Sequence, residues 1–276
     1  MQTPEYDPAD APLAVTPRPL PSASLGVAPV WHTVVLVAFI LWSSARGASQ
    51  LSVPHGSLNR LATYGTTALM ELALLGWVLF GLRLKRTPLR SLLGAFSFDT
   101  RSIVADLGFA LLFWISALAV LGSIGIVWSG VEAAVTHRPP PIHNAQSLAS
   151  DPSQEKEVRA LAELAPSGGG EIAAWVLLCL LVGFIEETVF RGYLQRQFIG
   201  WARGSVGAGV VLSALIFGGA HAYQGARNMV LLAVFGALFG LLAVYLRSLR
   251  AGMFAHSWHD LIAGLALAFL KAHHLI

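Results

Sequence analysis

The sequence predicts an all-α membrane protein with about seven transmembrane helices, of which the last four form a core in the C-terminal half. Of its 276 residues, 55% are hydrophobic and only 12% are charged, and the mean hydropathy is +0.64. Soluble domains carry roughly 25% charged residues, so this composition excludes an ordinary soluble fold. The apolar residues form runs of helical length, and Lys and Arg mostly flank these runs, as the positive-inside rule expects.

The charge and the cysteine content narrow the possible partners. A net charge of +3 arises from basic residues at the ends of apolar runs, so we expect membrane lipid as a partner and no nucleic acid. Cys179 is the only cysteine, which excludes an internal disulfide and a cysteine cluster for a metal. We expect Cys179 to be a small, buried, apolar side chain.

The N-terminal half is predicted to hold three transmembrane helices behind a leader. Residues 1–26 contain six prolines, which is typical of a disordered segment. The region 27–128 then holds apolar runs at about 27–45, 61–82 and 103–128. Glu71 interrupts the second run. We expect it to be a buried polar group paired with a neighbour, with a functional role as the second reading.

Residues 129–170 form the longest polar stretch and are predicted to be an extramembrane loop. Asp151-Pro152-Ser153-Gln154 has the pattern of a helix start, which predicts a short amphipathic helix over 152–164. This helix is either part of a plain connection or a lid on the membrane surface near a site.

The C-terminal region 171–276 is predicted to be the core. Its spans are expected at about 172–191, 206–223, 228–246 and 253–270. The mixed segment 193–204 suits an interfacial segment or a polar extension of the helix before it. Seven spans with a cytoplasmic N-terminus place 11 basic residues inside and 7 outside, which favours that orientation. Compact loops and glycine-rich helices favour the inner membrane of a bacterial cell.

Two adjacent carboxylates, Glu186 and Glu187, end the apolar run that begins at Ile172. An ionisable residue at membrane depth is a functional-site hypothesis by default. Glu187 and Arg191 are spaced i,i+4 in the favourable order for an ion pair, so Glu187 is expected to be the structural partner of Arg191. Glu186, about 100° away on the helix, is left on the side of Phe190 and is the better candidate for a general base.

Two further polar islands interrupt later spans. Phe217-Gly218-Gly219-Ala220-His221 ends the fifth span, and His256 and Asp260 are spaced i,i+4 in the seventh. Simple spans would separate Glu186 from His221 by about 15 Å in depth at 1.5 Å per residue. The islands can meet if the fourth helix continues past Arg191 to about Phe198, and we predict that extension.

These groups permit the activation of water. A carboxylate and a neutral imidazole can hold one water between them, and the carboxylate can accept its proton. A second histidine can donate to a developing oxyanion. Glu186, His221 and His256 also match the ligand types of a divalent metal such as zinc, so a metal is left open as a cofactor. The HExxH spacing of common metalloproteases is absent.

The three motifs resemble those of the CPBP family, which comprises the CAAX proteases, bacteriocin-processing membrane proteins and Rce1-like peptidases. They are Glu186-Glu187-x-x-x-Arg191, Phe217-x-x-x-His221 and His256-x-x-x-Asp260, and the resemblance covers about residues 170–270. It implies an intramembrane endopeptidase that acts on a membrane-associated peptide or protein.

The resemblance also implies roles for these residues. Glu186 and His221 would activate water, and His256 with Asp260 would line the oxyanion side. Glu187, Arg191, Phe217 and Phe190 would support the site. The family's third motif usually ends in asparagine, whereas this chain has Asp260, which either is protonated, orients His256 or helps to hold a metal.

Two other readings stay open at the level of the sequence. The protein could be a catalytically silent binding or immunity protein or a polar-lined permease, and Asp260 favours this class. Alternatively, the polar islands only hold the helices together. The oligomeric state is not assigned by the sequence.

Overall fold

The computed structural model describes residues 26–50, 59–94, 96–137, 158 and 161–275, and over these residues the protein is a bundle of helices. The predicted leader and the predicted helix start at Asp151 lie outside the described residues, apart from Gly26. The described elements, in chain order, are α1 Val30–Gln50, α2 Arg60–Leu84, α3 Leu89–Leu93, α4 Thr100–Thr136, α6 Gly169–Glu186, η3 Glu187–Leu194, α7 Gln195–Trp201, α8 Val206–Ala220, η4 Ala222–Gln224, α9 Gly225–Leu246 and α10 Arg250–Ala272.

The predicted fold class is confirmed. Six segments of the described chain are long and apolar enough to cross a membrane, and α8 is a shorter apolar helix. The predicted span 206–223 corresponds to α8, which is shorter than the other spans because it has 15 residues and ends before His221. Large apolar side chains such as Leu69, Leu112 and Leu177 are exposed on the outside of the bundle, as lipid-facing positions require.

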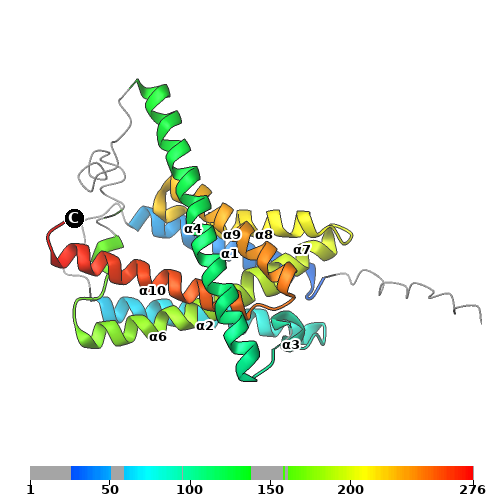
Figure 1. Ribbon diagram of the computed structural model, residues 1–276. Helices are drawn as coiled ribbons and strands as arrows, with labels where there is room; N and C mark the ends of the chain where they lie inside the picture. The colour runs from blue at the N-terminus through cyan, green and yellow to red at the C-terminus, as the bar shows by residue number, and fades with distance from the viewer. Residues whose placement is uncertain (1–25, 51–58, 95, 138–157, 159–160, 276) are drawn as a thin grey trace, which may run out of the picture.

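Helix α4 is longer than predicted. It has 37 residues, about 56 Å at 1.5 Å per residue, and continues from the predicted end at Trp128 to Thr136. The Asp99 side chain caps its first turn by accepting from the Ser102 N–H at 2.9 Å. Its C-terminal end projects beyond the other helices in Figure 1. Near the opposite end of α4, Asp106 forms an ion pair with Arg250 of α10.

The fourth span continues well past Arg191, as predicted. Helix α6, the π-helical turn η3 and α7 form one apolar segment over Gly169–Trp201. In a π turn, some backbone carbonyls are poorly placed to accept the usual i→i−4 hydrogen bonds of an α-helix. The Ser213 hydroxyl of α8 donates to the Phe190 carbonyl at 2.7 Å, which compensates at one of these positions. The segment 193–204 is therefore an extension of the helix rather than a separate interfacial segment.

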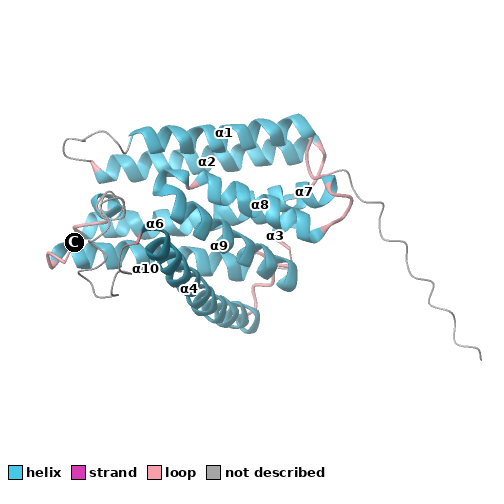
Figure 2. Cartoon of the chain, turned by 90° about the horizontal axis from the view of Figure 1, so that it is seen from above, coloured by secondary structure: helices cyan, strands magenta, loops and turns pink. Residues whose placement is uncertain are grey.

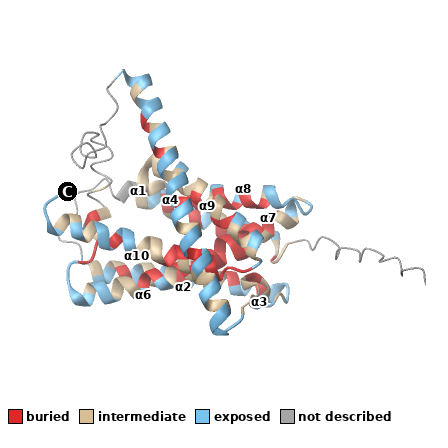
Figure 3. Ribbon diagram, viewed as in Figure 1, coloured by how far each residue is buried: buried red, intermediate tan, exposed pale blue. Residues whose placement is uncertain are grey.

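Helix α8 packs against α1, α7 and α9 on one face and exposes Val211, Leu212 and Leu215 on the other (Figures 1 and 2). Helices α8 and α9 are antiparallel neighbours joined by η4, and α6 packs beside α2 and α10. The side chains around η3 and the first half of α10 form the most buried part of the bundle, as Figure 3 shows. Because α8 is short, His221 lies within the bundle instead of at its end.

Helices α6 and α10 approach closely at Gly183. A Cβ added to Gly183 would lie 2.9 Å from the Ser257 nitrogen and 3.0 Å from the Met253 carbonyl oxygen, and the backbone cannot easily move away. We expect Gly183→Ala to destabilise the protein by about 1–3 kcal/mol, the usual effect of overpacking. The measurement is thermal unfolding of the detergent-solubilised protein.

Gly76 of α2 provides the matched control, because a Cβ there would meet nothing within 4 Å. Gly76→Ala should keep or raise the melting temperature, since alanine is the stronger helix former. Equal melting temperatures for the two variants would contradict the close α6–α10 packing.

Candidate active site

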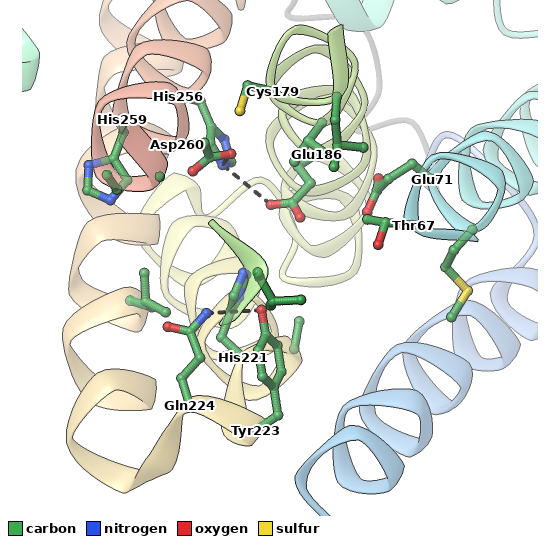
Figure 4. A pocket seen from close by; sticks show the side chains of 18 of the residues that line it. Thr67, Glu71, Cys179, Glu186, His221, Tyr223, Gln224, His256, His259 and Asp260 are labelled. Atoms are coloured by element: carbon green, nitrogen blue, oxygen red, sulfur yellow. Dashed lines mark hydrogen bonds and ion pairs between the residues drawn. The ribbon is translucent and has the colours of Figure 1, made fainter. Parts of the chain in front are cut away.

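A cavity of about 430 Å³ lies inside the bundle between α1, α2, α6, α10 and the turn after α8. Apolar side chains make up much of its wall, and several ionisable and amide groups line it as well (Figure 4). That polar group consists of Glu71, Glu186, His221, Tyr223, Gln224, His256, His259 and Asp260. An apolar cavity with a few convergent polar groups is the usual form of a binding or active site.

Glu186 is the last residue of α6 and faces this cavity. Its Oε2 atom is buried and has no hydrogen-bond partner among the described residues. The same atom lies 3.6 Å from His256 Nε2, slightly beyond direct hydrogen-bond distance. A buried carboxylate oxygen without a partner is a feature that requires an explanation, and a reactive role is one.

Glu187 connects two core helices through its carboxylate. It forms the predicted i,i+4 ion pair with Arg191, with Nη1 and Oε1 3.2 Å apart, and both side chains are 1% exposed. Its Oε1 also lies 3.0 Å from His256 Nδ1. Because a carboxylate of an ion pair only accepts, His256 Nδ1 carries the proton of this hydrogen bond. The contact with His256 was not predicted, since the two residues are far apart in sequence.

Aromatic rings enclose the Arg191 guanidinium. Its Cζ lies 4.3 Å from the centre of the Phe217 ring and 5.0 Å from that of Phe239. Phe190 packs edge-to-face on Phe217, with ring centres 5.0 Å apart. The Arg191 side chain also donates to the Gly236 carbonyl of α9 at 3.4 Å. These contacts place both predicted supporting aromatics, Phe190 and Phe217, around the buried cation.

His221 follows the last residue of α8 and lines the cavity opposite α6. Its Nδ1 lies 2.8 Å from the Phe217 carbonyl oxygen, which can only accept, so Nδ1 is the donor. In the neutral ring, Nε2 is then the nitrogen with a free lone pair. The local sequence fixes this arrangement because Phe217 and His221 are one helical turn apart.

Asp260 is one turn after His256 on α10, and its Oδ2 lies 3.7 Å from His256 Nε2. His256 Nε2 is therefore flanked by Asp260 on one side and Glu186 on the other, while Glu187 holds Nδ1. Of the alternatives for Asp260, this geometry favours the orientation of the His256 ring.

The donor set does not fit a metal centre as it stands. Among the described residues, no group of three or more His, Cys, Asp and Glu side chains is arranged to hold a metal ion. The arrangement offers no support for the zinc site considered from the residue types.

Several residues of the cavity were not predicted as site residues. The prediction that Glu71 pairs with a neighbour is wrong for its Oε2 atom, which is buried without a hydrogen-bond partner among the described residues. Tyr223 and Gln224 interact with each other at 3.0 Å, and His259 packs on Phe235. For Tyr223, Gln224 and His259, the only signal in the sequence is that they lie within three residues of His221 or His256. Cys179 is buried, as predicted, and lines the same cavity.

The end of the long polar stretch reaches the cavity. Leu161, Leu164 and Ala165 line it, and the Tyr64 hydroxyl donates to the Leu164 carbonyl at 2.5 Å. Most of the predicted helix 152–164 lies outside the described residues, and its last residues, 161–164, are helical. The two readings of this segment, a plain connection or a lid, both stay predictions.

Residues 168–262, about a third of the chain, match the protein family described as type II CAAX prenyl endopeptidase Rce1-like. This segment is Rce1-like, so the resemblance drawn from the three motifs is confirmed, and the matched residues include all three. No curated protein and no solved structure matches the chain. At the level of the family, the match supports a membrane-embedded endopeptidase of the CAAX-protease type.

The buried ion pair generates a stability prediction. Arg191→Met leaves the Glu187 carboxylate buried beside His256 without its cation, and we expect a loss of about 3–5 kcal/mol. The double variant Arg191→Met/Glu187→Gln removes both charges and should recover part of that loss. Melting temperatures of the two single variants and the double variant measure the coupling. A double variant whose loss equals the sum of the two single losses would show that the two side chains are not coupled.

Proposed function

We propose that the protein is an intramembrane endopeptidase that hydrolyses a peptide bond of a membrane-associated substrate through a water activated by Glu186. The single observation that carries this proposal is the buried Glu186 Oε2 atom, which faces the cavity without a hydrogen-bond partner among the described residues. A general base needs such an open position, from which it can take a proton directly or through one water.

His221 supports the same water from the opposite wall. Its Nδ1 proton is donated to the Phe217 carbonyl, so Nε2 of the neutral ring can accept a hydrogen bond from the water. Glu186 accepts one proton as the water oxygen attacks the carbonyl carbon of the substrate. The tetrahedral intermediate then breaks its C–N bond, and the departing nitrogen receives the proton from Glu186. No covalent bond to the protein forms in this sequence of steps.

His256 is proposed to position the reacting groups. Glu187 fixes its ring through Nδ1, and Nε2 then lies between Glu186 and Asp260. We propose that the ring is doubly protonated, because only in the imidazolium does Nε2 also carry a proton that it can donate to Glu186 or to charge that develops on the substrate oxygen. An ionised Asp260 accepts and cannot donate to an oxyanion, so its role is assigned to orienting His256.

A catalytically silent binding protein is the second candidate, and Asp260 is the observation that favours it. A carboxylate at this position adds negative charge to the side where an oxyanion would form. If the protein is a catalytically silent binding protein, we expect it to bind a ligand and to release no peptide product from any substrate.

Glu186→Gln tests the enzymatic proposal. The amide cannot accept the proton of the water, so cleavage is expected to fall at least about a hundredfold. The melting temperature should change little, because Glu186 Oε2 makes no hydrogen bond and its contact with His256 is 3.6 Å long. The readout is mass spectrometry of peptides produced from a membrane-peptide mixture by the purified protein.

Glu132→Gln is the matched control, because Glu132 is exposed on α4 and far from the cavity lining. This variant should cleave as the wild type does. Unchanged cleavage by Glu186→Gln would overturn the proposed mechanism, and the absence of product from the wild type would favour the silent binding protein. The same cleavage assay, repeated with a metal chelator, shows whether a metal ion contributes to cleavage.

We also propose that the N-terminus is cytoplasmic in the inner membrane of a bacterial cell. Of the 14 described Lys and Arg residues, Arg191 is buried inside the bundle, nine lie where α1 and α10 begin and α2 and α9 end, and four lie toward the opposite end. The nine are Arg83, Lys85, Arg86, Arg90, Arg101, Arg196, Arg203, Arg247 and Arg250, and the four are Arg46, Arg60, Arg227 and Lys271. The positive-inside rule places the first group in the cytoplasm.

Thiol labelling tests this orientation in a Cys179→Ala background. Thr100→Cys lies at the more basic end and Gly168→Cys at the other, and both positions are exposed. A membrane-impermeant maleimide should label Gly168→Cys, and not Thr100→Cys, in intact cells whose outer membrane has been permeabilised. The opposite pattern would reverse the proposed orientation.

A further inference from the structure

The cavity carries an excess of acidic groups. Three carboxylates, Glu71, Glu186 and Asp260, line it together with three histidines, and no Lys or Arg lines it among the described residues. The nearby cation of Arg191 is already engaged by Glu187, by two phenylalanine rings and by a backbone carbonyl. In a site of low dielectric, such an excess of negative charge favours either the uptake of a proton or a positively charged occupant.

Glu71 is the member of this group that the proposed reaction does not use. It is on α2, outside the matched segment 168–262, and none of the three motifs contains it. The residue is 8% exposed, and its buried Oε2 atom has no hydrogen-bond partner among the described residues. In Figure 4 its carboxylate and that of Glu186 lie on neighbouring walls of the same cavity.

The face of α2 that bears Glu71 continues as a polar stripe. Thr63, Thr67 and Glu71 are spaced i,i+4,i+8 and all three line the cavity. The stripe spans about 12 Å along the helix. It begins near the 161–165 segment, where Tyr64 binds the Leu164 carbonyl, and it ends beside the candidate catalytic groups. A substrate that lies along it would meet hydroxyl groups first and the Glu71 carboxylate last.

We propose that Glu71 binds a cationic group of the substrate, a Lys or Arg side chain or a free amino group close to the scissile bond. This inference rests on the proposed peptidase function and names its substrate class. An ammonium or guanidinium supplies both a donor for Glu71 Oε2 and a charge that offsets the acidic lining. A water molecule can supply the donor, but it leaves the excess of negative charge unchanged.

A binding measurement tests Glu71 without depending on cleavage. The probes are n-decylammonium and n-decanol, which share an apolar chain and differ in charge, at equal mole fractions in micelles of a nonionic detergent. Affinity is obtained from the shift in melting temperature with probe concentration. We expect the wild type to bind decylammonium about tenfold to a hundredfold more tightly than Glu71→Gln does, as for a hydrogen bond to a charged group. Decanol should bind both equally.

Glu132→Gln serves again as the matched control, since it removes an exposed carboxylate of the same type. It should keep the wild-type affinity for decylammonium. An equal loss in Glu132→Gln and Glu71→Gln would overturn the proposal, because the effect would then be general electrostatics. If Glu71→Gln does not fold, the wild type still decides the question: equal affinity for the two probes would mean that the cavity binds apolar chains only.

Cleavage provides the second readout. Peptides that the wild type cuts are resynthesised with each Lys near the scissile bond replaced by norleucine, which keeps the apolar stem and removes the charge. The wild type should prefer the Lys peptide about tenfold or more in kcat/KM, and Glu71→Gln should lose this preference. Equal use of both peptides by the wild type would contradict the role of Glu71 and leave the peptidase intact. No cleavage of any peptide would refute the peptidase, while the decylammonium measurement would still report on Glu71.

Discussion

The rest of the core depends on two buried contacts of Glu187, its ion pair with Arg191 and its hydrogen bond with His256. Isolated charges inside a bilayer are costly, so each must find a partner within the protein. Glu187 satisfies Arg191 within its own helix and His256 on α10. Arg191 in turn contacts Phe217 of α8 and the Gly236 carbonyl of α9. Four elements far apart in sequence are therefore fixed around a single ion pair, and the orientation of His256 follows from it.

The catalytic proposal depends on this support because Glu186 has none of its own. Its neighbour Glu187 contacts both Arg191 and His256 through Oε1, whereas Glu186 Oε2 is left without a hydrogen bond toward the cavity. Adjacent residues on a helix point in different directions, so one carboxylate can stabilise the core while the other remains available for chemistry. The π turn at Glu187–Leu194 begins between the two, and such turns are frequent at functional sites.

The N-terminal helices complete the site and are more than membrane anchors. Helix α2 supplies one wall of the cavity and its third carboxylate, and the 161–165 segment covers the region where the polar stripe of α2 begins. The Rce1-like segment 168–262 carries the candidate catalytic groups, and helices outside it contribute cavity contacts that the three motifs do not specify.

The sequence by itself determined the all-helical membrane fold and the Glu187–Arg191 pair, because each follows from composition or helical spacing over neighbouring residues. It also determined the continuation of the fourth helix, because Glu186 and His221 could reach the same depth only if that helix ran past Arg191. It also indicated that Glu186, His221 and His256 belong together, since unpaired polar groups are costly in lipid. Only the tertiary structure decided that Glu187 binds His256 and that the Glu71 Oε2 atom remains unpaired in the cavity. These contacts join residues on different helices or depend on side-chain direction, and the packing of one helix on another leaves no periodic signal in either.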